Sequence, residues 1–579
     1  MRFSMLLLLV GAMVPAPSLA SEDPEEMLPP RSAPRAIDPN GAPLSLLSRL
    51  PFVGRDGAAR IGAARGARPL ASREDLADLL AVPVDSLPDR LAFSPSRSIG
   101  LSFRQRAERT EAGLRLAECA EVRAGGVSAL LFAERDPGER RLDDFVSWSI
   151  AGGSERRLAA VAGDLSVRLG SGLLVGTSAP FGVPSDFGPY ESSRLSPYRS
   201  RMESAAHRGV GLRRTSLSRD FLFLLTSTKR DARVDTEGRV SSIDDSGLHR
   251  DEKEEARRDR LHERIAGLRW EERRGRVRFG WTAAGALFRP PLGGGSAARK
   301  PKAFRGDRLL ASSVDLRLDG RRTLFIGEIA HSTPGGSAGR VFLRRSIGAA
   351  KGLVRFRNFS GRFHAPRSTA FHRLGSEPSG EIGVLLLLEA PAGKRSTIAL
   401  RHHRYASFDR TYNSEGRVFG TEWAVDADRT FGRAVLSLGA SGGTRSEVRK
   451  GRRVAGETLA LSLGASLVRS PARFRIDAKG AASSLPGSDI VKTGLGVSFL
   501  ASFERGPLGT VSVSFAHLFM DERSIAFPSP ALPGSLPFAF FGGGREAAGI
   551  RVGWKGFRLG RWEGSLVLGP GRAGIEVAR

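Results

Sequence analysis

The sequence predicts a mainly β fold, a large antiparallel transmembrane β-barrel of roughly 14–20 strands preceded by a small all-α module. Three observations lead to this prediction. Short segments alternate apolar and polar residues over most of the chain, tight-turn signals separate these segments, and the first twenty residues resemble an export signal. A soluble β-solenoid or propeller is the alternative, but no fixed repeat supports it.

Four regions follow one another along the chain. The prediction is a signal peptide at 1–20, a flexible Pro-rich periplasmic tail at 21–43, a helix-hairpin-helix-like module at 44–95 and the barrel at 96–579. Beyond the signal peptide, no apolar run is long enough for a membrane helix. The chain has one cysteine, Cys119, so it forms neither an internal disulfide nor a thiolate metal cluster. An exported chain of this kind is expected in the outer membrane of a Gram-negative cell.

The net charge of +28, with a pI near 11.3, is spread over turns and alternating strand positions. A concentrated basic run would favour nucleic acid as a partner. Dispersed basic residues fit a wet barrel interior or anionic lipid headgroups equally well.

The module contains Leu50-Pro51-Phe52-Val53-Gly54 between two helix-like runs. This motif resembles the hairpin of competence-type helix-hairpin-helix DNA receptors, which implies that its backbone amides hold a DNA phosphate. A second hairpin is expected after Pro83, but Val84 and Asp85 stand where glycines belong, and Asp85 would repel a phosphate. A plain helical plug or docking module is the alternative.

The clearest strand is 276–288, RVRFGWTAAGALF. Val277, Phe279, Trp281, Ala283 and Leu287 fall on one side, and Arg276, Arg278, Gly280, Thr282 and Ala286 on the other. Residues 265–271 are the predicted partner strand. We expect the arginines of such wet faces to line the lumen, and the candidates are Arg276, Arg278, Arg317, Arg355 and Arg357.

Motifs within 46–408 resemble a family of outer-membrane β-barrel proteins that contain helix-hairpin-helix regions. They are a Gly-Asp strand followed by a Gly-x-Gly-Leu step, an early Asp-Pro-Gly-Glu hairpin and a long-loop signature. Their residues are Gly163, Asp164, Gly170, Gly172, Asp136, Pro137, Gly138, Glu139, Ser246, Gly247, Leu248, His249 and Arg250. The resemblance implies the same two-part architecture for this chain.

Two long polar segments, 194–209 and 244–264, are expected outside the cell, because outer-membrane barrels have long external loops. Within the second, 251–264 is a candidate salt-bridged helix. The chain does not end in an aromatic residue, so the closing strand is expected at 564–568 or near 554–557.

Patterns typical of enzymes are weak. Gly439-Ala440-Ser441-Gly442-Gly443 satisfies G-x-S-x-G, but a Gly-rich hairpin end is expected there. His402 and His403 should point to opposite faces of a strand, which is unsuitable for a shared metal. His207, His249 and His262 occupy loop-like segments and have no ligand spacing. No cofactor or metal is expected.

The leading hypothesis is a non-enzymatic outer-membrane pore, transport or envelope component. The alternatives are a DNA-binding or DNA-uptake protein that uses the helix-hairpin-helix turn, and a barrel hydrolase with scattered catalytic residues. The expected partners are outer-membrane lipid, the barrel assembly machinery and DNA or an anionic solute, with no defined protein partner.

Overall fold

The structure is a computed structural model. It describes residues 37–40, 42, 47, 53–67, 70, 73–80, 100–110, 113–124, 126–139, 144–153, 158–177, 184, 187, 188, 193–200, 202–216, 218–293, 303–333, 335–374, 378–411, 414–484, 491–504, 510–519, 526–528, 538–540, 546–559, 562–569 and 572–578. The predicted signal peptide and most of the predicted tail lie outside these residues.

The elements are α2 (Gly54–Ala67), α3 (Arg73–Leu80), β1 (Gly100–Thr110), β2 (Gly113–Ala124), β3 (Val127–Arg135), β4 (Phe145–Gly153), β5 (Leu158–Arg168), β6 (Arg194–Pro197), η3 (Glu203–Ala205), β7 (His207–Thr215), β8 (Arg219–Arg230), β9 (Ala232–Val234), β10 (Val240–Ile243), α4 (Glu252–Glu255), β11 (Leu261–Arg274), β12 (Val277–Leu292), β13 (Gly306–Asp319), β14 (Thr323–Ser332), β15 (Gly336–Ile347), β16 (Ala350–Phe359), β17 (Glu381–Pro391), β18 (Ser396–Thr411), β19 (Ser414–Phe431), β20 (Ala434–Arg449), β21 (Arg452–Arg469), β22 (Ala472–Ser484), β23 (Val491–Glu504), β24 (Thr510–Phe519), β25 (Ala526–Pro528), β26 (Phe538–Phe540), β27 (Glu546–Leu559), β28 (Trp562–Gly569) and β29 (Arg572–Ala578).

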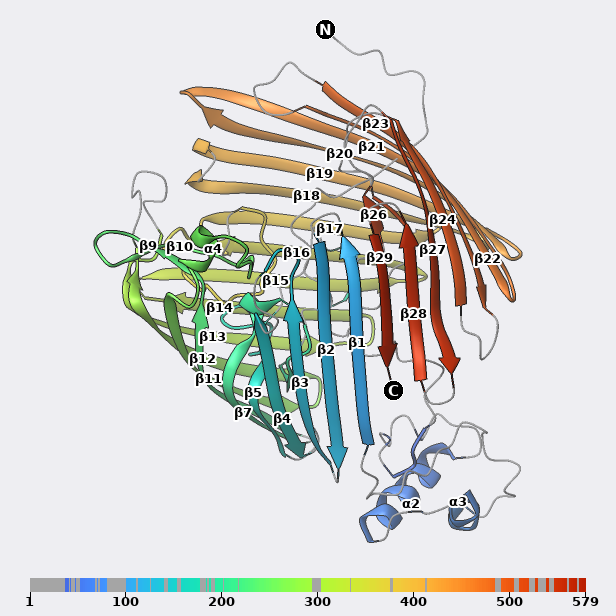
Figure 1. The fold of residues 1–579 in the computed structure, drawn as a ribbon. Helices are drawn as coiled ribbons and strands as arrows, with labels where there is room; N and C mark the ends of the chain where they lie inside the picture. Colours follow the sequence, from blue (N-terminus) through green and yellow to red (C-terminus); the bar gives the residue numbers. More distant parts are fainter. Residues whose placement is uncertain are drawn as a thin grey trace.

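A closed antiparallel ring of 24 strands dominates the molecule (Figure 1). Each ring strand pairs with its neighbours, and β29 pairs with β1 from Arg104↔Ala578 to Thr110↔Arg572, which closes the ring. The predicted fold class is therefore confirmed. The closing strand was predicted wrongly, at 564–568 or near 554–557: it is β29, which the prediction passed over because it looked for an aromatic residue.

The ring holds more strands than the roughly 14–20 expected from strands of about ten residues with long loops. The difference arises because many connections are hairpins of two or three residues. Lys450 and Gly451, between β20 and β21, both have positive φ (50° and 73°). This is the type I′ geometry whose twist matches that of the flanking strands.

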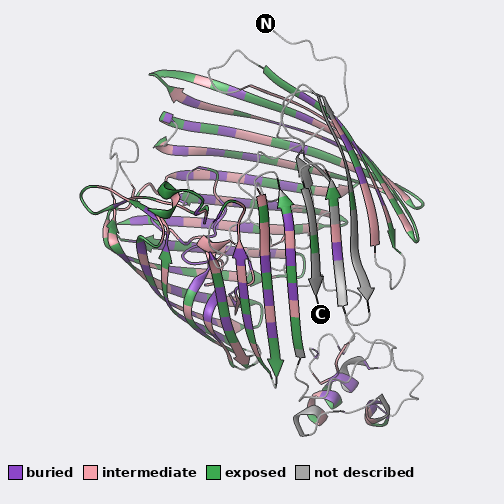
Figure 2. Cartoon of the chain, viewed as in Figure 1, coloured by how far each residue is buried: buried purple, intermediate pink, exposed green. Residues whose placement is uncertain are grey.

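Strand residues alternate between the two faces of the wall, as Figure 2 shows along β1 to β4. On β12, Val277, Phe279, Trp281 and Leu287 are exposed on the outer face, whereas Gly280 and Thr282 are buried on the inner face. The predicted partner strand is present as β11, which pairs with β12 from His262↔Arg289 to Arg274↔Val277. The prediction of period-two alternation around this hairpin is confirmed.

The two ends of the ring differ in the length of their connections. One end, called here the turn end, has short connections such as 275–276, 320–322 and 348–349. The other, called here the loop end, carries 136–144, 169–206, 231–260, 293–305 and 360–380. The strand β1 begins at the turn end and β29 ends there, so both flank the same side of the ring.

Ahead of the ring, α2 and α3 form a small helical unit that lies beyond the turn end, near the start of β1 (Figure 1). Its core contains Leu47, Val53, Ile61, Leu76 and Leu80, all buried. None of the helices within the described residues has the length and hydropathy of a bilayer-spanning helix.

Candidate functional site

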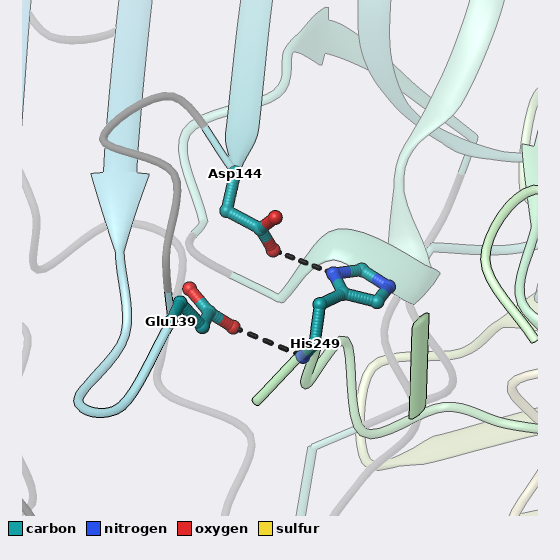
Figure 3. A group of neighbouring side chains, drawn as sticks. All are labelled: Glu139, Asp144 and His249. Carbon is teal, nitrogen blue, oxygen red and sulfur yellow. Dashed lines mark hydrogen bonds and ion pairs between the residues drawn. The ribbon is translucent and has the colours of Figure 1, made fainter. Parts of the chain in front are cut away.

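A cluster of buried charged side chains lies at the loop end, centred on His249. The His249 Nδ1 is 2.5 Å from an Asp144 carboxylate oxygen, and its Nε2 is 2.8 Å from an Asp231 carboxylate oxygen. The backbone N–H of His249 donates to Glu139 at 3.2 Å. Figure 3 shows Asp144 and Glu139 facing His249 from the β3–β4 connection. Both ring nitrogens thus face carboxylates, which is the arrangement of a doubly donating imidazolium.

Local backbone geometry brings these groups together. Gly138 has a φ of 91°, and the Glu139 N–H donates to the Asp136 carbonyl oxygen at 3.3 Å, so the turn closes on itself. The Glu139 carboxylate accepts from the Asp136 N–H at 2.7 Å. A Cβ added to Gly138 would lie 3.4 Å from the Arg250 side chain. The Asp-Pro-Gly-Glu hairpin and the Ser246–Arg250 signature are therefore two halves of one contact.

The cluster holds an excess of acids. Glu139, Asp144, Glu203 and Asp231 surround His249, and Arg258 adds a second cation at 2.6 Å from Asp144. Oxygen and nitrogen atoms in two overlapping triads lie close enough for one metal ion. However, separations of 2.5 and 2.8 Å are hydrogen-bond distances, and they use both nitrogens of the ring. The arrangement is a charge clamp between loops, and we call these five residues with Arg258 the latch.

The pKa values of the latch follow from this arrangement. Burial opposes the charge of His249, but its hydrogen bonds to Asp144 and Asp231 outweigh burial and raise its pKa to about 10. Burial and the negative charge of Asp144 raise the pKa of Glu203 to about 9. For Asp144, burial acts upward, but the hydrogen bond with His249 and the charge of Arg258 leave its pKa below the ordinary value. A cleft of about 580 Å³ opens beside these groups.

We expect alkaline pH to loosen the latch. His249 has a raised pKa, so its stabilising effect is complete below about 6.5 and is lost as the pH rises through about 10. Glu203 also has a raised pKa, and its ionisation near pH 9 adds a negative charge to the acidic cluster. Proteinase K should therefore cut 244–260 faster at about pH 10 than at about pH 7. Cutting at turn 275–276 is the internal control, and equal acceleration at both sites would contradict the prediction.

A plug formed by residues 169–177 and 360–374 fills part of the lumen. Its apolar side chains pack in one core against inward residues of the wall. This core includes Leu169, Leu173, Leu174, Val175, Phe363, Ala365, Leu222, Leu224, Ile265 and Phe359. The inner wall is apolar here, because the loops cover it, and the expectation that wet strand faces line the lumen is wrong for this sector.

Polar contacts hold the plug at defined points. Arg367 forms an ion pair with Glu263 of β11 at 2.6 Å and donates to the Ser204 carbonyl oxygen at 2.7 Å. The Gly176 N–H donates to the Arg367 carbonyl oxygen at 2.7 Å, which joins the two plug segments. Arg367 and Glu263 are 8% and 1% exposed, so this is a buried ion pair whose loss would be costly.

The Gly-x-Gly step lies in this plug. Gly172 has a φ of 79°, and a Cβ there would lie 2.1 Å from the Thr369 hydroxyl, so only glycine fits. The Gly172 carbonyl oxygen accepts from the Thr369 N–H at 2.9 Å. A Cβ on Gly170 would lie 3.1 Å from the Arg269 guanidinium. Both glycines let neighbouring side chains approach the backbone closely, and neither provides a functional group.

The Gly-Asp pair joins three strands of the wall. A Cβ on Gly163 would lie 2.3 Å from the Trp148 carbonyl oxygen. The Asp164 carboxylate accepts from the Trp148 N–H at 3.1 Å and pairs with Arg208 at 2.8 Å. This motif therefore fixes the packing of β4, β5 and β7.

Most of the predicted lumen arginines already have partners within the protein. Arg276 lies exposed in the β11–β12 turn, whereas Arg278 and Arg317 share Asp319 at 3.3 and 2.8 Å. Arg355 donates to the Gly188 carbonyl oxygen at 2.8 Å, and Arg357 pairs with Glu381 at 2.5 Å. The structure thus does not gather these five arginines into one site.

The predicted histidine and serine candidates are also dispersed. His403 is buried and His402 exposed, so they face opposite sides of β18. His262 lies on β11, with its Nε2 2.6 Å from the Ser227 hydroxyl, and it lines the cleft beside the latch without contacting His249. Residues 439–443 lie inside β20, because both neighbouring strands pair with them, and the expected hairpin end is wrong. The predicted helix in 251–264 is one turn, α4, since Leu261 already begins β11.

Of the predicted phosphate-binding residues, Leu50, Pro51 and Phe52 lie outside the described residues. Val53 is buried and Gly54 begins α2. The Gly57 N–H donates to the Val53 carbonyl oxygen at 3.1 Å, the first bond of the helix.

Comparison with known proteins was made at three levels. Neither family models nor curated proteins match the chain. Among solved structures, it is similar to the P pilus usher PapC translocation pore, at 12% identity over 83% of this chain and 98% of that chain, with a TM-score of 0.36. It is also similar to the siderophore receptor PirA from Acinetobacter baumannii, at 8% identity over 84% and 81%, with a TM-score of 0.43.

A third similar structure is an anion-selective porin from Comamonas acidovorans, at 14% identity over 62% of this chain and 100% of that chain, with a TM-score of 0.29. Likenesses this weak identify no client for this chain. The fold and the site by themselves define its class, a large closed β-barrel with an internal plug.

Proposed function

We propose that the chain is a non-enzymatic outer-membrane barrel, a pore or transport component whose lumen is closed at rest by its own plug. The observation that carries the proposal is an apolar outer face combined with a plug held inside the ring. Leu131, Ile150 and Ile329 are 53%, 50% and 65% exposed on the outer face. A surface of this kind invites aggregation in water and is solvated by lipid.

The orientation follows from the lengths of the connections. In outer-membrane barrels the short turns face the periplasm and the long loops face outward. The loop end, with the latch, then faces the outside of the cell, and the turn end faces the periplasm with α2 and α3. Outer-membrane lipid and the barrel assembly machinery are the partners that this location requires.

The plug supports a gated pore. Its segments 169–177 and 360–374 belong to the β5–β7 and β16–β17 connections, so opening is a rearrangement of these connections within the lumen. A few polar contacts, chiefly the Arg367–Glu263 ion pair, hold the plug in its closed position, so breaking them shifts the plug toward the open one. The latch holds the connection 231–260 in place at the loop end.

An anionic solute is the client class that we favour. Arg278 and Arg317 share the single carboxylate of Asp319, which leaves an excess positive charge at the turn end. A positive constriction favours anions in transit. Binding of DNA through Gly54 and hydrolysis by scattered residues remain predictions of the sequence.

Heat-modifiable gel migration of protein extracted from outer membranes tests closure and location together. The expected result is a compact form in unheated sample that migrates differently after boiling, from the outer-membrane fraction alone. Planar-bilayer recordings of the same protein should show little conductance at rest and, after plug release, a reversal potential that favours anions. Protein recovered soluble from the periplasm would overturn the proposal.

A further inference from the structure

The outer wall near the loop end carries a hollow of about 480 Å³ across β8, β11, β12 and β13. Its floor consists of small residues, Ala266, Ala283, Gly285 and Ser312. These residues lie on the outer face, since Ala283 and Gly285 alternate with the exposed Trp281 and Leu287 on the same side of β12. A Cβ on Gly285 would lie 3.1 Å from Leu310, whose side chain borders the hollow.

A row of basic side chains lies on the same outer face, closer to the loop end. Lys229, His262 and Arg289 are direct cross-strand partners on β8, β11 and β12. In the next row, Arg264 and Arg308 both pair with Leu287. The side chains of Lys229 and Arg308 are 65% and 78% exposed.

Acidic partners do not balance this row. Asp259 lies 3.5 Å from Lys229, and Asp307 lies 3.7 Å from Arg308. Among the described residues, Arg264 and Arg289 form no ion pair. His262 and Leu287 stand between these basic side chains, which therefore lie one strand apart on the same face, where like charges still repel each other. The row therefore gains stability from an external anion.

The distance between the row and the hollow matches one kind of ligand. Gly285 and Ala266 lie two to four residues from Arg289 and Arg264 along their strands, or roughly 7–13 Å at about 3.3 Å per residue. An anionic group at one end and an apolar body at the other is the chemistry of a lipid with a phosphate headgroup. Basic residues at a membrane surface attract such headgroups.

We propose that this face binds a phosphate-bearing lipid, with its headgroup against Arg264, Arg289 and Lys229 and an acyl chain in the hollow beside Gly285. The site rests on the proposed function, because only a barrel in a membrane presents this face to lipid. With the loop end outside the cell, the lipid belongs to the outer leaflet.

The experiment uses the whole protein, delipidated in detergent and mixed with fluorescent phosphatidylglycerol or phosphatidylcholine in nanodiscs. We expect phosphatidylglycerol to bind more tightly than phosphatidylcholine. Arg264→Ser with Arg289→Ser should weaken phosphatidylglycerol binding about tenfold or more, because each basic residue contributes separately. Ala283→Phe, which fills the hollow and keeps the charge, should weaken it too.

Arg274→Ser is the matched control, since Arg274 is an exposed arginine at the turn end, 84% exposed and paired with Glu272. It should leave binding unchanged. Unchanged binding in the double arginine variant would overturn the proposal. Loss in that variant but not in Ala283→Phe, with competition by inorganic phosphate, would identify a simple anion site and overturn the lipid assignment.

Heat-modifiable migration of every variant separates the two proposals. A variant that stays heat-modifiable is a closed barrel, so its binding result bears on the lipid site alone. Failure of the unmodified protein to show heat-modifiable migration would overturn the proposed function first.

Discussion

Arg367→Ala is expected to convert a nearly closed barrel into a conducting one. The substitution removes the cation 2.6 Å from Glu263 of β11, which is 1% exposed, and leaves it only the more distant Arg230 at 3.6 Å. Removing one partner of a buried ion pair costs about 3–5 kcal/mol. If that cost falls on the closed state, the population of open plugs rises by about a hundredfold or more. Single-channel recordings in planar bilayers measure this directly, as a higher open probability at the same voltage.

Two variants control this experiment. Arg362→Ala removes the same charge from an exposed residue of the same loop and should leave the open probability unchanged. Glu263→Gln combined with Arg367→Met removes both charges of the pair, which is far less destabilising than removing one. It should therefore conduct less than Arg367→Ala. Equal conductance in all three variants would show that the ion pair does not hold the plug.

His249→Ala is expected to release the latch and to expose 244–260 to protease. The change removes the cation that lies between Asp144 and Asp231, while the acids of the cluster remain. The exposed fraction of His249 is only 7%, so the loss is that of a buried charge partner, about 3–5 kcal/mol. Trypsin cleavage of this loop in the folded protein should accelerate about a hundredfold, because cleavage follows the open population.

His402→Ala is the matched control, since His402 is an exposed histidine on the outer face of β18. It should leave the cleavage rate unchanged. His249→Ala combined with Asp231→Asn removes one of the repelling acids and should restore part of the protection. If the double variant were cleaved as fast as His249→Ala, packing and not charge would hold the loop.

The fold could be predicted because a barrel wall repeats one local rule. Each residue of a strand faces either lipid or lumen, so the alternation along β12 and the turn after Asp319 are visible in the sequence. The number of strands was underestimated, because long loops were allowed for where many connections are hairpins of two or three residues. Apolar residues on both faces of β8 also hide its period: Leu222 and Leu224 face the plug, while Phe221 and Leu225 face outward.

The candidate site was only half visible from the sequence. The resemblance to a family singled out Gly138, Glu139 and His249, but gave no reason for them. Asp144, which completes the latch, was missed, because one aspartate among 61 acidic residues carries no local signal. It is 105 residues away from His249 in the chain, and only the closure of the ring brings the two together.

By itself, the sequence determined the wall, with its alternating faces, its turns and its abundance of glycines at positions of positive φ. It did so because these properties depend on neighbours within a few residues. The tertiary structure alone decided what fills the wall and what its charges do. The plug, the Arg367–Glu263 pair and the latch each join residues that lie far apart in the chain. Such pairings follow from the order in which 24 strands close into a ring, and no local pattern records that order.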